Sequence, residues 1–166
     1  MSYEYRGMVV REMNSSDPHE TEEVAWMLGG NHSAMKKLET RMQTRHIKVL
    51  VVDGSVVGFC MYDEDDELVS KTIWFIEHYW VNEEYRGSRA STFFAGVLFN
   101  EYMTDMPVYA GSIDASTFTG FMRKVSISGR GNRMVKFYRL TKEFRDRIHK
   151  VKEKFKWVHH IRSSKT

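Results

Sequence analysis

The chain has 166 residues, enough for one domain with a substantial core, and its composition, 42% hydrophobic with two prolines, is that of an ordered globular protein. Its single cysteine, Cys60, excludes an internal disulfide and favours a reducing compartment. The apolar run V-V-G-F-C-M-Y around Cys60 indicates a core position. There is no signal-peptide pattern and no apolar run of about 18 residues, so we expect a cytoplasmic protein without a membrane span.

The net charge of +3 hides a difference between two parts of the chain. Residues 1–140 carry 16 Lys and Arg against 19 Asp and Glu, whereas residues 141–166 carry 9 against 3. We therefore divide the sequence into a mildly acidic body, 1–140, and a basic tail, 141–166. This difference bears on the partners of the protein rather than on its fold.

The first elements are a strand and two helices. Met8 to Met13 has strand character, and the segment N-S-S-D-P that ends at Pro18 breaks it and begins a helix. That helix ends at Gly29-Gly30-Asn31, and Ser33 to Met42 forms the second helix.

A β-hairpin follows the helices. His46–Val52 and Ser55–Tyr62 are rich in β-forming residues, and Asp53-Gly54 between them is a strong hairpin signal. The next segment, D-E-D-D-E at 63–67, is expected to be a solvated turn, with a divalent-cation site as the alternative.

The second half of the body alternates strands and helices. A long run of β-forming residues at 69–81 predicts a central strand, and the apolar stripe of 90–102 predicts a helix after it. A short strand at 107–111, a short helix at 116–125 and a final strand at 134–140 follow, with one more short strand near Ser126. The strand–helix–strand unit at 73–111 implies parallel pairing, and the hairpin implies antiparallel pairing. We therefore predict an α+β fold with a mixed central β-sheet flanked by helices.

The loop between the central strand and its helix reads V-N-E-E-Y-R-G-S-R-A-S from Val81 to Ser91. A polar loop that leads into a helix N-terminus can bind an anion, because unpaired N–H groups point out of the first turn. Gly87 permits close approach of the backbone, and Arg86 and Arg89 add charge. Hydroxyl groups of Ser88, Ser91 and Thr92 are further candidate donors. Alone, such a loop is a weak signal.

The order of the elements and this loop together resemble the GNAT superfamily of acyl-CoA-dependent N-acyltransferases, over roughly residues 6–140. V-N-E-E-Y-R-G-S-R-A is similar to the family signature V-x-P-E-Y-R-G-x-G-x-G, and F-M-R-K-V-S-I at 121–127 resembles the later F-Y-E-K-L-G-F. The resemblance implies that acetyl-CoA or another acyl-CoA is the co-substrate, and that a backbone N–H at or near Val81 polarises its thioester carbonyl. It implies that the coenzyme pyrophosphate lies on the loop formed by Arg86, Gly87, Ser88, Arg89, Ala90 and Ser91.

Three departures from the family pattern bear on coenzyme binding and catalysis. Arg89 and Ser91 stand where the signature usually has small residues, mostly Gly, and Met122 stands where the family often has a tyrosine acid. Y-R-G-S-R-A-S resembles the variant of divergent, phage-borne members, which would place the protein in the cytoplasm of a host cell.

Glu77 is the candidate catalytic base, because it interrupts an apolar strand on which family members often carry a base. Strand alternation would place Glu77, Tyr79 and Val81 on one face unless a bulge intervenes. The alternatives are a salt-bridged glutamate at position 77 and His78 as the base. Tyr138 and Tyr109 are the candidates for the acid, and the histidines other than His78 show no metal-ligand spacing.

The basic tail carries an amphipathic stripe: Phe144, Ile148, Val151, Phe155 and Val158 are spaced as on one face of a helix. This helix packs on its own body or on a second subunit in a homodimer. The alternatives are nucleic-acid contact, with lysines on phosphates and Phe155 and Trp157 stacking on bases, or a membrane surface.

Three functions follow from this sequence. The first is direct acyl transfer from acyl-CoA to an amine acceptor. The second is a non-catalytic interaction protein that binds nucleic acid or protein through its tail. The third is a nucleobase-modifying enzyme on the same fold.

Overall fold

The computed structural model describes residues 1–30, 32–65, 73–104, 106, 108–112, 126–131, 136–140 and 142–161. Within these residues the strands are β1 (Ser2–Tyr5), β2 (Met8–Glu12), β3 (His46–Val52), β4 (Ser55–Asp65), β5 (Ile73–Val81), β6 (Val108–Ser112), β7 (Ser126–Gly131), β8 (Lys136–Leu140) and β9 (Val158–His160). The helices are α1 (Pro18–Leu28), α2 (His32–Arg41), α3 (Arg89–Val97) and α5 (Lys142–Phe155). A 3-10 turn, η1 (Glu83–Tyr85), follows β5, and a π-helical turn, η2 (Leu98–Tyr102), continues α3. None of the described helices is long and apolar enough to cross a membrane.

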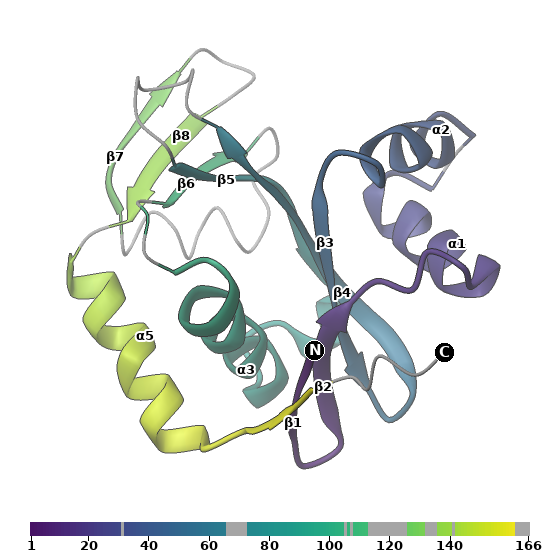
Figure 1. The fold of residues 1–166 in the computed structure, drawn as a ribbon. Helices are drawn as coiled ribbons and strands as arrows, with labels where there is room; N and C mark the ends of the chain where they lie inside the picture. Colours follow the sequence, from purple (N-terminus) through teal and green to yellow (C-terminus); the bar gives the residue numbers. More distant parts are fainter. Residues whose placement is uncertain are drawn as a thin grey trace.

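The described strands form one mixed sheet in the order β7-β8-β6-β5-β4-β3-β2-β1-β9 (Figure 1). Only β5 and β6 pair in parallel; the other neighbours are antiparallel. The α+β class, the hairpin at Asp53-Gly54 and the parallel strand–helix–strand unit are therefore confirmed. The sequence did not predict β1, a four-residue strand that reaches β2 through a turn with positive φ at Arg6 (47°) and Gly7 (80°).

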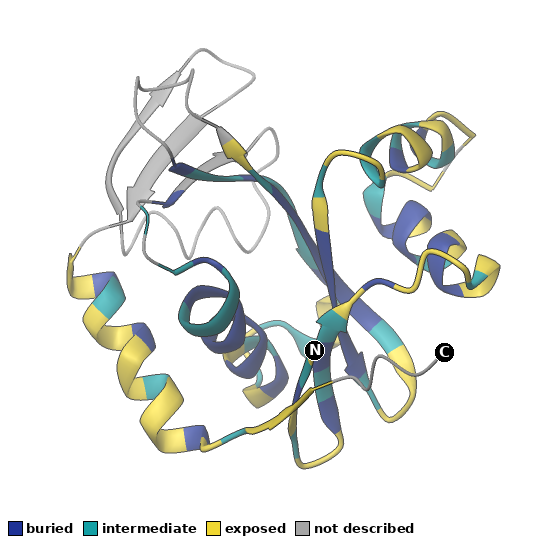
Figure 2. Ribbon diagram, viewed as in Figure 1, coloured by how far each residue is buried: buried dark blue, intermediate teal, exposed yellow. Residues whose placement is uncertain are grey.

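Helices cover both faces of the sheet (Figures 1 and 2). α3 and η2 lie on one face with α5 packed outside them, and their core includes Phe93, Phe99 and Phe144. α1 and α2 cover the other face over a second core that contains Val24 and Leu38. The central strands are therefore packed from both sides.

The N-terminus of α1 follows its sequence signals. The Asp17 side chain accepts a hydrogen bond from the N–H of His19, and Pro18 occupies the first turn. Glu20 is buried there, where it pairs with Arg11 and accepts the N–H of Asn14. A buried carboxylate requires such partners, and these contacts tie α1 to β2.

Two predictions about the acidic segment at 63–67 have separate outcomes. The solvated turn is wrong for Asp63–Asp65, because β4 continues through them and Asp63 pairs with Phe75 of β5. The described residues contain no group of three or more ligands that could hold a metal ion. Several predicted features lie outside the described residues: the helix at 116–125 with Met122, the motif at 121–125, and the side chains of Tyr109 and Tyr138.

The amphipathic helix of the tail is α5, and it packs on the body of its own chain. Phe144, Ile148 and Phe155 are buried, and Val151 lies against Gly96 of α3. Its predicted extension to Val158 is wrong, because the helix ends at Phe155 and Val158 is an exposed residue of β9. The division at residue 140 stays a prediction about the sequence; the segment after it contributes to the same core and sheet.

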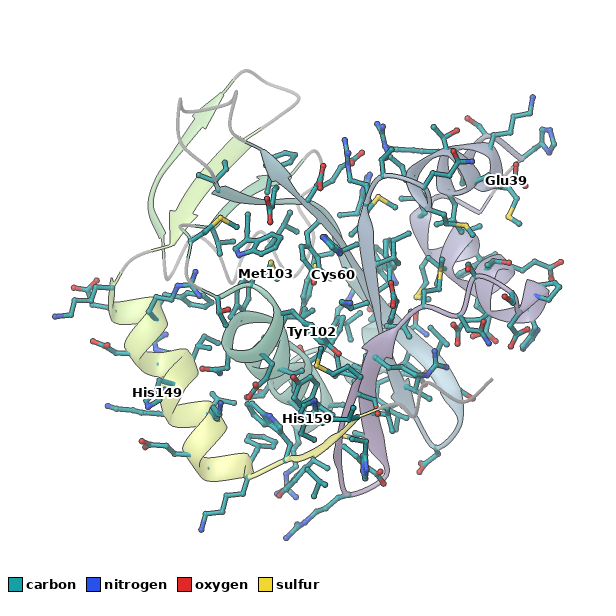
Figure 3. The ribbon with its side chains drawn as sticks, in the orientation of Figure 1. Glu39, Cys60, Tyr102, Met103, His149 and His159 are labelled. Atoms are coloured by element: carbon teal, nitrogen blue, oxygen red, sulfur yellow. The ribbon has the colours of Figure 1, made fainter. Side chains whose placement is uncertain are left out.

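Cys60 lies inside the core on the α3 side of β4 (Figure 3). Burial raises the pKa of its thiol above the ordinary value. We therefore expect a thiol reagent to leave the native protein unmodified and to label the one cysteine per chain after unfolding. Equal labelling rates in the native and the unfolded protein would contradict a core position for Cys60.

Candidate functional site

β5 has an open edge beyond the point where β6 leaves it. β6 pairs with β5 only from Trp74 to Ile76, whereas β5 continues to Val81 along β4 (Figure 1). Within the described chain, residues 77–81 therefore have a strand neighbour on one side only. An unpaired strand edge offers backbone donors and acceptors to a ligand.

The backbone of Val81 points toward this open edge. The N–H of Asn82 donates to the carbonyl of Val57 in the β4 segment at 2.8 Å, so Asn82 faces β4. Alternation along the strand then turns the N–H and C=O of Val81 to the opposite side. The Val81 carbonyl does accept Nε of Arg86 there, at 2.7 Å. The N–H of Val81 thus points to the edge where the sequence analysis expects a donor.

A β-bulge places Glu77 on the α2 side of the sheet. The pairing of β4 with β5 passes from Met61–His78 to Tyr62–Ile76, which leaves Glu77 as the extra residue. Glu77 reaches Arg41 and Arg45, whereas Tyr79 packs against Phe94 of α3. Glu77 therefore does not share a face with Tyr79 and Val81, because a bulge, the exception allowed for in the sequence analysis, changes the alternation.

Two guanidinium groups hold the Glu77 carboxylate. Nε of Arg41 lies 3.1 Å from Oε1, and Nε of Arg45 lies 3.2 Å from Oε2. Arg45 also binds Asp63 at 2.9 Å through its Nη1. The Glu77 side chain is 18% exposed, so the two guanidinium groups lie against a mostly buried carboxylate. This is the salt-bridged arrangement left open in the sequence analysis.

His78 lies beside Glu77 and contacts α2 as well. Its Nε2 is 2.9 Å from Nζ of Lys37 and 3.8 Å from Oε1 of Glu77. Sequence reasoning did not place Lys37, Arg41 and Arg45 in this cluster. Their partners Glu77 and His78 lie more than 30 positions away, and only the packing of α2 and of the segment after it brings them together.

The loop after β5 leaves backbone donors unused at the N-terminus of α3. Among the described residues, the N–H groups of Gly87, Arg89 and Ala90 find no hydrogen-bond acceptor. Gly87 has φ of 68°, and a Cβ added to it would meet nothing within 4 Å. Free N–H groups, open space and the positive end of a helix dipole suit an anion.

The hydroxyl groups of this loop are used inside it. The hydroxyl of Ser88 donates to the carbonyl of Tyr85 and accepts the N–H of Ser91, and the Thr92 hydroxyl donates to the carbonyl of Ser88. Ser91 also hydrogen-bonds Tyr79. In this structure the hydroxyls of Ser88 and Thr92 therefore donate within the loop, and their expected role as donors to a ligand stays a prediction.

The two arginines of the loop differ in their surroundings. The guanidinium of Arg86 lies 4.5 Å from the centre of the Trp80 ring and bonds Val81, so it fixes the loop to β5. Arg89 is exposed and has no ion pair among the described residues. The structure thus brings Val81 and the loop from Arg86 to Ser91 together, and Glu77 lies four positions earlier, toward the opposite helix layer.

Tyr79 is a phenol close to the loop. Burial, with a smaller contribution from Cys60, raises the pKa of the Tyr79 phenol, and the hydrogen bond with Ser91 opposes that shift. A phenol with a raised pKa is a weak proton donor. Tyr79 therefore does not replace Tyr109 or Tyr138 as the candidate acid.

A family model described as acetyltransferase (GNAT) family matches residues 11–93, half of the chain. No curated protein matches the sequence.

Solved acetyltransferase structures share the fold at low identity. The ribosomal L7/L12 alpha-N-protein acetyltransferase RimL in complex with coenzyme A has a TM-score of 0.60 at 9% identity, over 87% of this chain and 99% of that one. Aminoglycoside 6'-acetyltransferase type Ii has a TM-score of 0.59 at 15% identity, over 80% and 95%. A GNAT family acetyltransferase from Elizabethkingia anophelis with acetyl-CoA bound has a TM-score of 0.53 at 9% identity, over 81% and 97%.

Proposed function

Because the chain belongs to the GNAT acetyltransferase family, we propose that it transfers an acyl group, with acetyl as the first candidate, from an acyl-CoA directly to an amine. One observation carries this proposal: the loop with free N–H groups at the N-terminus of α3, which suits an anion, lies next to the open edge of β5. The coenzyme A and acetyl-CoA in two of the similar structures support an acyl-CoA as the donor.

The loop from Arg86 to Ser91 would hold the coenzyme. The free N–H groups of Gly87, Arg89 and Ala90 suit the oxygens of a pyrophosphate, and the guanidinium of Arg89 is available for its charge. The N–H of Val81 would polarise the thioester carbonyl, which is an oxyanion-type role. The thioester supplies an activated acyl group, and the protein supplies its orientation.

Glu77 would accept the proton of the acceptor amine, directly or through one water. Arg41 and Arg45 fix the position of the carboxylate, and a carboxylate oxygen can accept a proton. α3 covers one face of β5, so the amine would reach the open edge from the side of α1 and α2. The bulge at Glu77 turns the carboxylate toward that side.

A second candidate function is nucleic-acid binding through the tail. One observation favours it: α5 and the residue after it carry five exposed cations without an ion pair among the described residues, namely Lys142, Arg147, Lys150, Lys154 and Lys156. Of the two aromatic residues expected to stack on bases, Phe155 is buried, and Trp157 is half-buried with one edge against Phe93. A steep fall of DNA affinity with salt would support phosphate contacts on this helix.

Calorimetric titration of acetyl-CoA and desulfo-CoA tests the coenzyme seat. Gly87→Asp should weaken both ligands about tenfold or more, since its carboxylate faces the pyrophosphate and about 1.4 kcal/mol of repulsion suffices. Gly30→Asp is the matched control: Gly30 has φ of 70°, close to the 68° of Gly87, but follows α1. The proposal fails if the native protein shows neither heat nor a thermal shift, or if the two variants weaken binding equally.

A further inference from the structure

Three aromatic side chains from distant parts of the sequence meet beside α3. The ring centre of Tyr5 in β1 lies 6.0 Å from Phe93 and 5.0 Å from Phe155, and Phe93 lies 6.3 Å from Phe155. Trp157 extends the cluster, with its ring 5.9 Å from Phe93. These contacts fix the C-terminal end of α5 against the first half of α3. The cluster of Tyr5, Phe93 and Phe155 is called the aromatic trio below.

Each member of the aromatic trio has a cation next to it. Arg6 follows Tyr5, and its guanidinium is 5.3 Å from the centre of the Tyr5 ring. Lys154 and Lys156 flank Phe155, and Arg89 precedes Phe93 by four positions, which places both on one side of α3. All four cations are exposed, and none has an ion pair within the described part of the chain.

Other cations of α5 are engaged within the fold. Arg145 donates to the carbonyls of Phe99, Met103 and Met106 at 3.2, 3.2 and 3.0 Å, and Lys152 pairs with Glu101 at 2.8 Å. These contacts of Arg145 and Lys152 stabilise the packing of α5 on the body of the chain. The four cations at the aromatic trio have no such partner, and like charges gathered from three elements repel one another.

The position of these cations relates them to the coenzyme seat. Arg89 is the first residue of α3, and its N–H is one of the three free donors there. Coenzyme A carries a third phosphate on the ribose of its ADP moiety, a few bonds from the pyrophosphate. A ligand with its pyrophosphate on α3 would therefore have a second anionic group within reach of the neighbouring surface.

We propose that Arg6, Lys154 and Lys156, with Arg89, bind the 3′-phosphate of the coenzyme, so that the basic tail is part of the donor site. This inference rests on the proposed function. It assigns a ligand to charges that the stability of the fold does not require. It also gives the basic tail a role in affinity for the coenzyme rather than in recognition of the amine acceptor.

Titrations with coenzyme A and 3′-dephospho-coenzyme A test this assignment. The double variant Lys154→Gln/Lys156→Gln should weaken coenzyme A about three- to tenfold, because each exposed charge pair contributes modestly, and should leave the dephospho form unchanged. Lys142→Gln/Lys150→Gln removes the same charge from positions earlier in the same helix and should leave both affinities unchanged. Higher salt should reduce the difference between the two ligands in the native protein.

The possible failures can be told apart. If the native protein binds neither ligand, the proposed function and this inference both fall. If it binds both ligands equally well, only the 3′-phosphate site is overturned. If Lys154→Gln/Lys156→Gln lowers affinity for a DNA duplex in a salt-dependent shift but leaves coenzyme A unaffected, the surface serves nucleic acid instead and the inference is wrong.

Discussion

Glutamine in place of Glu77 should lower kcat by about 10²-fold or more, with little change in affinity for the coenzyme. Glutamine has nearly the shape of glutamate and keeps an acceptor oxygen for one of the two arginines, Arg41 or Arg45, but it cannot take the proton of an amine. Initial rates measured as thiol release, with an amine that supports turnover, give kcat, and titration of acetyl-CoA gives the affinity. The single cysteine of the chain is buried and should not disturb a thiol assay.

Asp63→Asn provides the control for Glu77. Asp63 also pairs with Arg45, at 2.9 Å, but it lies on β4. Both substitutions remove one carboxylate from the same cluster, so a purely structural role predicts similar losses of activity and of melting temperature. If Glu77 is the base, only Glu77→Gln loses most of its kcat. Similar kcat values for the two variants would mean that Glu77 is not the base and serves only as an ion-pair partner that links α2 to β5.

Alanine in place of Phe93 should destabilise the protein by about 3–5 kcal/mol, because it removes a fully buried aromatic ring and leaves a cavity. The ring contacts Tyr5, Phe155 and Trp157, so the cavity would open where β1, α3 and α5 meet. Denaturant unfolding gives the difference in free energy. The variant should still fold under native conditions if the protein has ordinary stability for its size.

Trp26 is the matched aromatic residue for that measurement. It lies on α1 with 70% of its surface exposed. Trp26→Ala should change the free energy of unfolding by less than about 0.5 kcal/mol. A loss at Phe93 no larger than that at Trp26 would mean that α5 is not fixed on α3 in solution, and it would remove the basis for placing Lys154 and Lys156 near the coenzyme.

Local signals explain which parts of the fold the sequence predicts. Asp53-Gly54 sets the hairpin, Asp17 and Pro18 begin α1, and the loop at Gly87 leads from β5 into α3; each needs only neighbouring residues. These signals were sufficient for the α+β class and for the position of the candidate coenzyme seat.

The features that sequence reasoning missed depend on contacts between distant residues. The bulge at Glu77 arises from the register between β4 and β5, and the pairing of Glu77 with Arg41 and Arg45 arises from the placement of α2. β1 is too short to stand out, and it is stabilised by β2 and β9. The end of α5 at Phe155 could not be predicted either. It is set by the residues after it, which turn toward β1, and β1 is distant in the sequence.

The pairing of β1 with β9 has a consequence for how the chain acquires its structure. Glu4 and His160 meet across these strands although 156 positions separate them in the sequence. Closing so large a loop is slow, and β1 cannot find this neighbour before β9 has left the ribosome. A nascent chain would therefore expose the edge of β1 until residues 158–160 have emerged, and a truncation before residue 158 would leave that edge open to association with other chains.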